Sequence, residues 1–121
     1  MPLTKLDHFN VRTTDLTATL HFYEDVLGLR SGYRPPFPFA GAWMYIGDQP
    51  VVHIACLDPG CEPGSGRVNH VAFFADEIDS VRSRIDAEGH PYTERTVPDQ
   101  SLRQIFVKDP NGVTVELNFA I

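Results

Sequence analysis

Four residues of the types that bind divalent metal ions occupy matching places in the two halves of the chain. His8 and His70 lie in similar stretches about half the chain apart, and His53 and Glu116 lie on the last extended run of each half. Imidazole and carboxylate groups together suit a borderline divalent cation, and two His with one carboxylate suit non-haem Fe(II). A single His on a strand usually has an ordinary hydrogen-bond partner. Four such residues at repeat-related positions instead favour a shared metal site.

The elements that would position these residues occur twice. Residues 6–11 (Leu-Asp-His-Phe-Asn-Val) resemble residues 68–73 (Val-Asn-His-Val-Ala-Phe). A helical stripe of apolar residues follows each stretch: Leu16, Leu20, Tyr23 and Leu27, then Ile78, Val81 and Ile85. We expect each helix to follow an Asp and to end at a Gly, namely Asp15 and Gly28, then Asp76 and Gly89.

Three extended runs follow each predicted helix, at 29–34, 42–47 and 50–57 and at 91–96, 102–108 and 113–119. Asp48-Gln49-Pro50 and Asp109-Pro110-Asn111-Gly112 are the turns before each last strand. The chain is therefore predicted to be an α+β fold of two βαβββ modules, 1–58 and 67–121. The Gly- and Pro-rich linker 59–66 joins them into one functional domain. Each half is marginal in size for its own core, so the modules must pack together or pair with a second chain. We expect a homodimer.

Strand alternation predicts which residues share the candidate site. In the last strand Val115 and Leu117 point towards the helix, and Glu116 points away from it. The same reasoning places all four candidate ligands on the face away from the helices. Other residues are candidates for substrate binding: Asn10, Trp43, Tyr45 and Arg103. His21 and His90 are expected to be surface residues.

Composition excludes several classes of protein. The chain has 121 residues and a formal charge of −6, with no basic cluster, which argues against nucleic-acid binding. No apolar run approaches the roughly 20 residues that span a bilayer, and the N-terminal residues lack a signal-peptide pattern. We therefore expect a cytoplasmic protein whose partner is a small molecule rather than nucleic acid or a membrane. No phosphate-binding Gly loop or dinucleotide fingerprint is present.

Four stretches of the chain together resemble the vicinal-oxygen-chelate superfamily, which includes glyoxalase I, extradiol dioxygenases and the bleomycin resistance proteins. They are Leu6–Val11, Phe22–Leu29, Asn69–Phe73 and Phe106–Leu117. The resemblance implies mixed sheets that curl around a metal cleft, with ligands from the first and last strands of each module. By position these ligands are His8, His53, His70 and Glu116. In this family a divalent metal holds two neighbouring oxygens of the substrate.

The resemblance also implies alternatives for the reaction. Extradiol dioxygenases place a catalytic His near position 53, so His53 favours ring cleavage of an aromatic diol with Fe(II) bound by His8, His70 and Glu116. Phe106 stands where those dioxygenases have a Tyr. A glyoxalase I-like lyase or epimerase would instead use Ni, Zn, Co or Mn to hold an enediolate, with Glu116 or His53 as the base. The third alternative is a ligand-binding or resistance protein without turnover.

Overall fold

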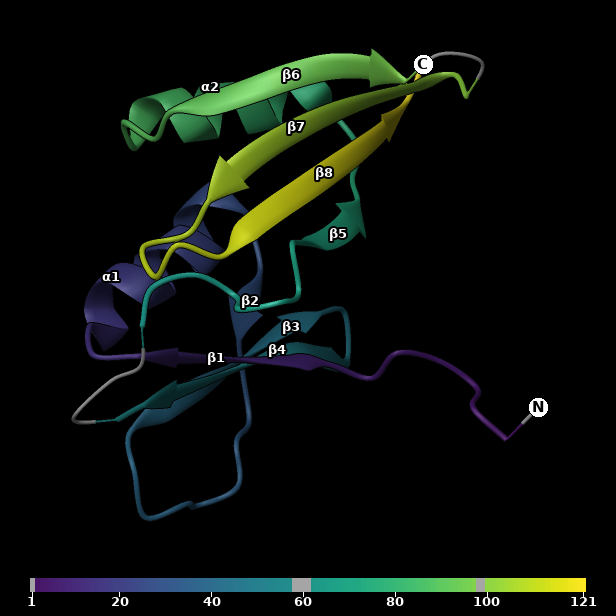
Figure 1. Ribbon diagram of the computed structural model, residues 1–121. Helices are drawn as coiled ribbons and strands as arrows, with labels where there is room; N and C mark the ends of the chain where they lie inside the picture. The colour runs from purple at the N-terminus through teal and green to yellow at the C-terminus, as the bar shows by residue number, and fades with distance from the viewer. Residues whose placement is uncertain (1, 58–61, 98–99) are drawn as a thin grey trace.

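The computed structural model describes residues 2–57, 62–97 and 100–121, which form two modules, each with a mixed four-stranded sheet (Figure 1). The first module contains β1 (Phe9–Thr13), α1 (Leu16–His21), the π-helical turn η1 (Phe22–Val26), β2 (Arg30–Ser31), β3 (Gly41–Ile46) and β4 (Gln49–Cys56). The second contains β5 (Val71–Phe74), α2 (Ile78–Ala87), β6 (Tyr92–Val97), β7 (Leu102–Lys108) and β8 (Thr114–Ala120). The predicted pair of βαβββ modules is confirmed. Residues 58–61, at the predicted module boundary and linker, lie outside the described residues.

The two sheets have the same topology. Their strand orders are β1-β4-β3-β2 and β5-β8-β7-β6, so the first strand of each module pairs in parallel with its last strand. The remaining pairs are antiparallel. The edge strands β1 and β5, which His8 and His70 precede, therefore lie beside β4 and β8, which carry His53 and Glu116. Asn10 lies opposite His53, and Ala72 lies opposite Glu116.

Two predicted strands begin later than their sequence patterns indicate, and a third is shorter. β1 starts at Phe9 and β5 at Val71, so His8 and His70 immediately precede their strands. The run predicted at 29–34 contributes only Arg30 and Ser31 to the sheet. Three prolines follow at positions 35, 36 and 38, and proline has no N–H with which to extend a strand ladder.

The first helix begins as predicted but continues as a π-helical turn. The Asp15 carboxylate accepts a hydrogen bond from the N–H of Ala18 at 3.0 Å, and Gly28 adopts a φ of +79°. The apolar stripe predicted from a regular helical repeat is only half-buried at Leu16, Leu20 and Leu27. Of that stripe only Tyr23 is fully buried, together with Thr19, Phe22 and Val26, which lie outside it. The wider π turn rotates the buried face relative to a continuous α-helix.

The second helix begins at Ile78, two residues after Asp76, which the sequence pattern places before the helix. Glu77, not Asp76, is the N-cap residue, in a left-handed conformation with φ 61°. Gly89 ends the helix as predicted, with φ +73°, and the N–H of His90 donates to the carbonyl of Ile85. Ile85 is fully buried, and Ile78 and Val81 are half-buried.

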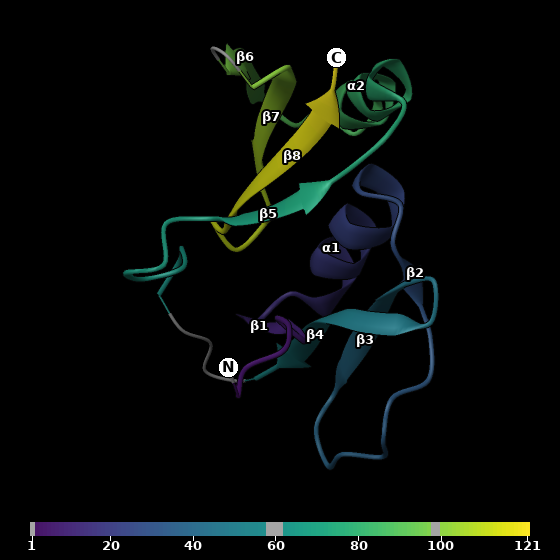
Figure 2. The ribbon, with the colours of Figure 1, turned by 90° about the vertical axis from the view of Figure 1, so that its right-hand side faces the viewer.

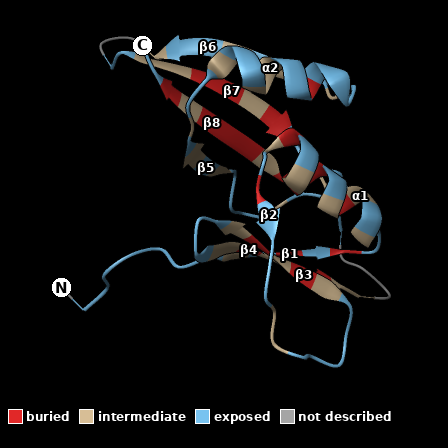
Figure 3. Cartoon of the chain, turned by 180° about the vertical axis from the view of Figure 1, so that it is seen from behind, coloured by how far each residue is buried: buried red, intermediate tan, exposed pale blue. Residues whose placement is uncertain are grey.

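The two modules share one hydrophobic core. Figure 2 shows α1 between the two sheets, and Figure 3 shows buried residues along β7, β8 and α1. Fully buried side chains from both modules belong to the same cluster, among them Phe22, Met44, Ile85 and Ile105. The opposite face of each sheet, away from the helices, carries the candidate ligands together with aromatic residues such as Trp43 and Phe106. No helix among the described residues is long and apolar enough to cross a membrane.

Candidate metal centre

The first module brings His8 and His53 together. Their imidazole rings stack with centroids 3.6 Å apart and an interplanar angle of 11°. Nδ1 of His8 lies 2.7 Å from Oδ2 of Asp7, a contact that fixes the ring and leaves Nε2 for another partner. The Trp43 ring covers the other face of His53 at a centroid distance of 3.9 Å. The side chain of His53 is thus enclosed between two aromatic rings.

The surroundings of His53 lower the pKa of its imidazole. Burial lowers the pKa of His53 from its ordinary value, and the neighbouring His8 lowers that pKa further. Its Nε2 atom is buried without a hydrogen-bond partner in the described residues. A half-buried imidazole with a lowered pKa and a buried, unpaired ring nitrogen is suited to bind a cation.

The second module brings His70 and Glu116 together. Nε2 of His70 lies 3.2 Å from Oε1 of Glu116. Nδ1 of His70 lies 2.9 Å from the side-chain oxygen of Asn69 and donates to it. Nε2 of His70 therefore faces a carboxylate oxygen, and a cation between these two atoms could be bound by both.

The four candidate ligands form two pairs rather than one cluster. In the described ranges, no three His, Cys, Asp or Glu side chains gather where they could hold a metal ion. A cavity of about 730 Å³ lies along β1 beside residues 62–66, but none of the four residues lines it. Each module therefore brings together one pair of candidate ligands.

Asn10, Trp43 and Tyr45 share the first module's polar face with His53. Asn10 and Trp43 are the two cross-strand neighbours of His53, on β1 and β3. The Tyr45 hydroxyl donates to the carbonyl of Tyr33 at 2.5 Å, so Tyr45 holds the aromatic loop 33–40 against β3. Asn10 and Trp43 flank the candidate centre, and Tyr45 contributes to its margin.

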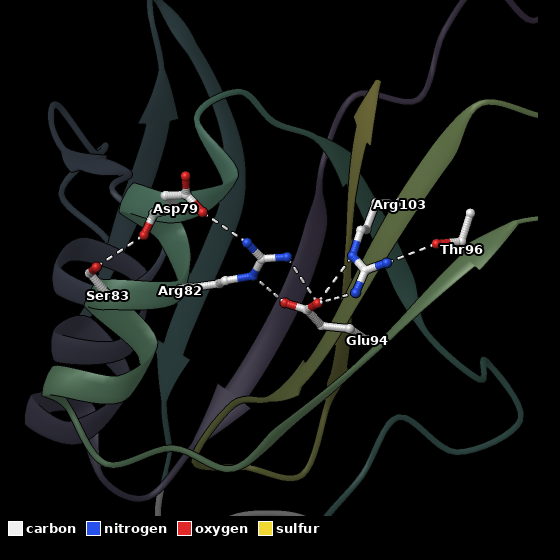
Figure 4. A network of polar contacts seen from close by, with 6 residues as sticks. All are labelled: Asp79, Arg82, Ser83, Glu94, Thr96 and Arg103. Atoms are coloured by element: carbon white, nitrogen blue, oxygen red, sulfur yellow. Dashed lines mark hydrogen bonds and ion pairs between the residues drawn. The ribbon is translucent and has the colours of Figure 1, made fainter. Parts of the chain in front are cut away.

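Arg103 lies on the other face of the second sheet, in the network shown in Figure 4. Its guanidinium donates to Glu94 at 2.8 Å and to Thr96 at 2.8 Å. Glu94 also accepts from Arg82 of α2, so these contacts join the helix to the sheet. The alternation of β7 turns Arg103 away from the face of Glu116. The structure therefore separates Arg103 from His70 and Glu116, contrary to the expected substrate contact.

Sequence reasoning missed the residues that orient the candidate ligands. Asp7 and Asn69 hold corresponding positions before His8 and His70, and both contact Nδ1 of the following ring. The internal repeat contained this signal, because the two residues align. The Nδ2 group of Asn118 donates to Oε2 of Glu116 at 2.8 Å, which alternate residues on one strand can do.

The two remaining histidines lie among the helices. His21 is exposed, as expected. Its Nδ1 lies 2.5 Å from Asp25, and its Nε2 lies 2.5 Å from Glu88. His90, expected at the surface, is half-buried and packs its ring edge-on against Phe22 at 5.3 Å. Packing of η1 against the end of α2 covers His90, which the local sequence did not indicate.

Comparison with known proteins places this architecture among known families. Residues 5–117 match the family described as the Glyoxalase/Bleomycin resistance protein/Dioxygenase superfamily. The chain is 28% identical over 119 residues to a probable lactoylglutathione lyase from Vibrio parahaemolyticus, covering 91% of this chain and 86% of that protein.

Solved structures show the same fold. A glyoxalase/dioxygenase from Nostoc punctiforme has a TM-score of 0.82 at 20% identity, covering 99% of this chain and 93% of that chain. The genomically encoded fosfomycin resistance protein FosX from Listeria monocytogenes has a TM-score of 0.77 at 22% identity. That match covers 98% of this chain and 95% of that one.

Proposed function

Because the chain belongs to the Glyoxalase/Bleomycin resistance protein/Dioxygenase superfamily, we propose that it is a metal-dependent enzyme acting on a small molecule with two neighbouring oxygens. One observation carries this proposal. Each module presents two ligand-capable side chains in contact, His8 with His53 and His70 with Glu116, on the face away from the core. The two pairs occupy corresponding places in the two modules, beside the parallel pairs β1–β4 and β5–β8.

The residues present fit a borderline divalent cation. Buried Nε2 of His53 has no protein partner among the described residues, and Nε2 of His70 faces a carboxylate oxygen. Nδ1 of His8 and Nδ1 of His70 are occupied by neighbouring side chains, the usual outer contacts of a metal-binding imidazole. Three imidazoles and one carboxylate suit Fe(II), Ni, Zn, Co or Mn better than Mg or Ca. A metal held there would act as a Lewis acid on two neighbouring substrate oxygens.

We infer that two chains complete the centre. In the described part of the chain β1 pairs only with β4 and β5 pairs only with β8, so each sheet ends in an open strand edge. Open edges are surfaces on which another strand can pair. In the proposed homodimer, the His8–His53 pair of one chain meets the His70–Glu116 pair of its partner. Two equivalent centres would result from one two-fold axis.

The protein side chains supply proton transfer. Asn118 occupies Oε2 of Glu116, which leaves Oε1 as the carboxylate oxygen that can accept a proton. His53 has a lowered pKa and is neutral at physiological pH, so its Nε2 can bind a cation or accept a proton. The Trp43 ring restricts the access of water to His53.

The reaction class that these positions favour is that of a lyase or isomerase. His53 stacks on His8, which suits four protein ligands in one centre rather than three. Phe106 lies opposite Glu116 in the sheet and offers no hydroxyl to a bound substrate. Ring cleavage of an aromatic diol is the second candidate, and the neutral imidazole of His53 favours it as an acid–base group.

Metal analysis and turnover of anaerobically purified protein test these proposals. We expect a divalent metal bound to the dimer, and turnover with Ni, Zn, Co or Mn that does not need O2. Bound iron together with O2 uptake on catechols would instead establish ring cleavage. Protein that takes up no metal, and whose ligand affinity is unchanged by His8→Ala, would overturn both and indicate a binding protein without turnover.

A further inference from the structure

A chain of polar side chains crosses the second sheet on the face that holds Glu116. Asn118 Nδ2 donates to Glu116 Oε2 at 2.8 Å, and Gln104 Nε2 donates to Asn118 Oδ1 at 2.9 Å. Arg95 Nε donates to Gln104 Oε1 at 2.7 Å. The chain therefore connects a candidate metal ligand on β8 to an arginine on β6, two strands away.

All three hydrogen bonds run in the same direction. Each side-chain amide donates a hydrogen bond in the direction of Glu116 and accepts one from the direction of Arg95. The amide dipoles are therefore aligned, with the Arg95 cation at one end and the Glu116 carboxylate at the other. Such an arrangement strengthens each bond in the series. Gln104 is only 8% exposed, so loss of either contact would leave a buried amide group unpaired. The two amides thus fix the positions of Glu116 and Arg95 relative to each other.

The Arg95 guanidinium turns towards the candidate centre. It lies over the ring of Phe106, 5.1 Å from the ring centroid, and Phe106 is the cross-strand neighbour of Glu116. Neighbouring strands are about 4.8 Å apart, so the cation lies within roughly one or two strand spacings of Glu116. A small molecule bound at Glu116 and lying on Phe106 would reach it.

The end of the Arg95 side chain remains open to a ligand. The Nε–H of Arg95 donates to Gln104, which leaves the two terminal amino groups of Arg95 free to bind a carboxylate as a planar fork. Arg95 is exposed, and no carboxylate lies within ion-pair distance of it in the ranges 2–57, 62–97 and 100–121. Arg82 and Arg103, by contrast, are both paired with Glu94.

We propose that Arg95 binds a carboxylate of the substrate, while the two neighbouring oxygens of that substrate are held at the centre containing His70 and Glu116. Phe106 forms the surface on which the intervening part of the substrate lies. Gln104 and Asn118 are positioning residues that keep the anion-binding end aligned with the chelating end. This inference rests on the proposed function and adds its substrate class: a chelating small molecule with a carboxylate at the far end.

Two rigid chelators that differ by one carboxylate provide the test. Catechol and 3,4-dihydroxybenzoate are titrated by calorimetry into the zinc-loaded full-length protein, its Arg95→Gln and Arg95→Lys variants, and Arg103→Gln as the matched control. Arg95→Gln should lower the affinity for 3,4-dihydroxybenzoate about tenfold, the effect of losing one charged contact, and leave the affinity for catechol unchanged. Arg95→Lys should retain part of the affinity because the charge remains without the planar fork.

The control separates this inference from the proposed function. Arg103→Gln should leave both affinities at the wild-type value, because Arg103 lies on the opposite face. If wild-type protein binds both chelators and Arg95→Gln changes neither affinity, or weakens both equally, Arg95 is not the carboxylate contact. If the zinc-loaded wild-type protein binds neither chelator, the proposed function fails and the inference fails with it.

Discussion

The hydroxyl of Tyr23 donates a hydrogen bond to the carboxylate of Asp109 at 2.9 Å, across the boundary between the two modules. Both side chains are buried. The other carboxylate oxygen, Oδ1, accepts from the N–H groups of Asn111 and Val113 at 2.8 Å each. Burial and the nearby Asp109 raise the pKa of Tyr23 well above its ordinary value, so the phenol stays protonated as a donor. The turn before β8, and therefore the position of Glu116, depends on a residue of the first module.

Removing this hydroxyl should destabilise the protein. Tyr23→Phe leaves Oδ2 of the buried Asp109 without its donor, and should lower the free energy of unfolding by about 1–3 kcal/mol. Urea denaturation measures the effect. Tyr45→Phe is the control, since its hydroxyl bonds to a loop carbonyl at the surface and should cost less than about 1 kcal/mol. Equal losses in the two variants would contradict a special role for the contact between modules.

Acid should destabilise the protein through Glu94. Hydrogen bonds from Arg82, followed by those from Arg103, lower the pKa of Glu94 from 4.5 to about 2. The unfolded chain binds the proton more tightly, so this stabilisation is present above pH 4.5 and is lost as the pH falls towards 2. Its size is about 1–2 kcal/mol at neutral pH, because solvent partly screens the group.

Unfolding of Glu94→Gln, measured between pH 5 and 2, should show a shallower acid slope than the wild-type protein. Asp79→Asn provides the matched control, because Asp79 bonds to the same Arg82 but is 94% exposed. That variant should retain most of the wild-type slope. A Glu94→Gln slope identical to wild type would mean that other carboxylates dominate the acid response.

Alkali should weaken a contact between the helices at His21. The hydrogen bond with Glu88 is the main cause that raises the pKa of His21, and the charge of Asp25 raises it further. The stabilisation is complete below the unfolded value of 6.5 and is lost as the pH rises through the higher folded value. NMR titration of the His21 ring should give a midpoint above 6.5, and Glu88→Gln should lower it. A midpoint at or below 6.5 in the wild-type protein would refute the contact in solution.

Glu116→Gln should separate metal binding from folding. The substitution keeps the volume of the side chain and an oxygen for Asn118, but removes the charge that faces His70. Metal affinity should fall about 100-fold or more, while the free energy of unfolding of the metal-free protein changes by less than about 1 kcal/mol. Metal titration and urea denaturation of the same samples give both values. Unfolding without any change in metal affinity would show that Glu116 is a structural residue.

Mixing two inactive variants tests whether the centre is shared between chains. A chain with His8→Ala and His53→Ala lacks one pair, and a chain with His70→Ala and Glu116→Gln lacks the other. Neither homodimer has a complete centre, but the mixed dimer has one. After subunit exchange at equal concentrations, about a quarter of the wild-type metal content should return. No recovery, in samples where mass spectrometry confirms mixed dimers, would place each centre within a single chain.

The internal repeat predicted most of the fold. The extended runs predicted after each helix match β3, β4, β6, β7 and β8 within about one residue, and β4 and β8 also carry the period-two alternation of a strand with one buried face. The π-helical turn η1 is not predictable from the sequence pattern, because apolar spacing alone does not distinguish it from an α-helix. The sequence predicts Asp109 only as a turn residue, since its bond to Tyr23 joins positions 86 residues apart.

The candidate ligands were accessible from sequence because the repeat aligned them. His8 and His70 precede equivalent strands, and Glu116 alternates with buried Val115 and Leu117. Arg103 was misplaced because its neighbours in sequence do not reveal Glu94, which lies across the strand pair and captures the guanidinium. Arg95 was overlooked for the converse reason, because its orientation depends on Gln104 and Phe106 rather than on local pattern.

The division of the ligands between two modules makes ion retention depend on protein concentration. A single chain could bind an ion with only one pair of ligands, either His8 and His53 or His70 and Glu116. The proposed dimer would bind the ion with all four. Dilution would then release the ion as the chains part, and added metal would draw them together again. The metal concentration that half-saturates the protein should therefore fall as the protein concentration rises, because dimer formation is a second-order equilibrium.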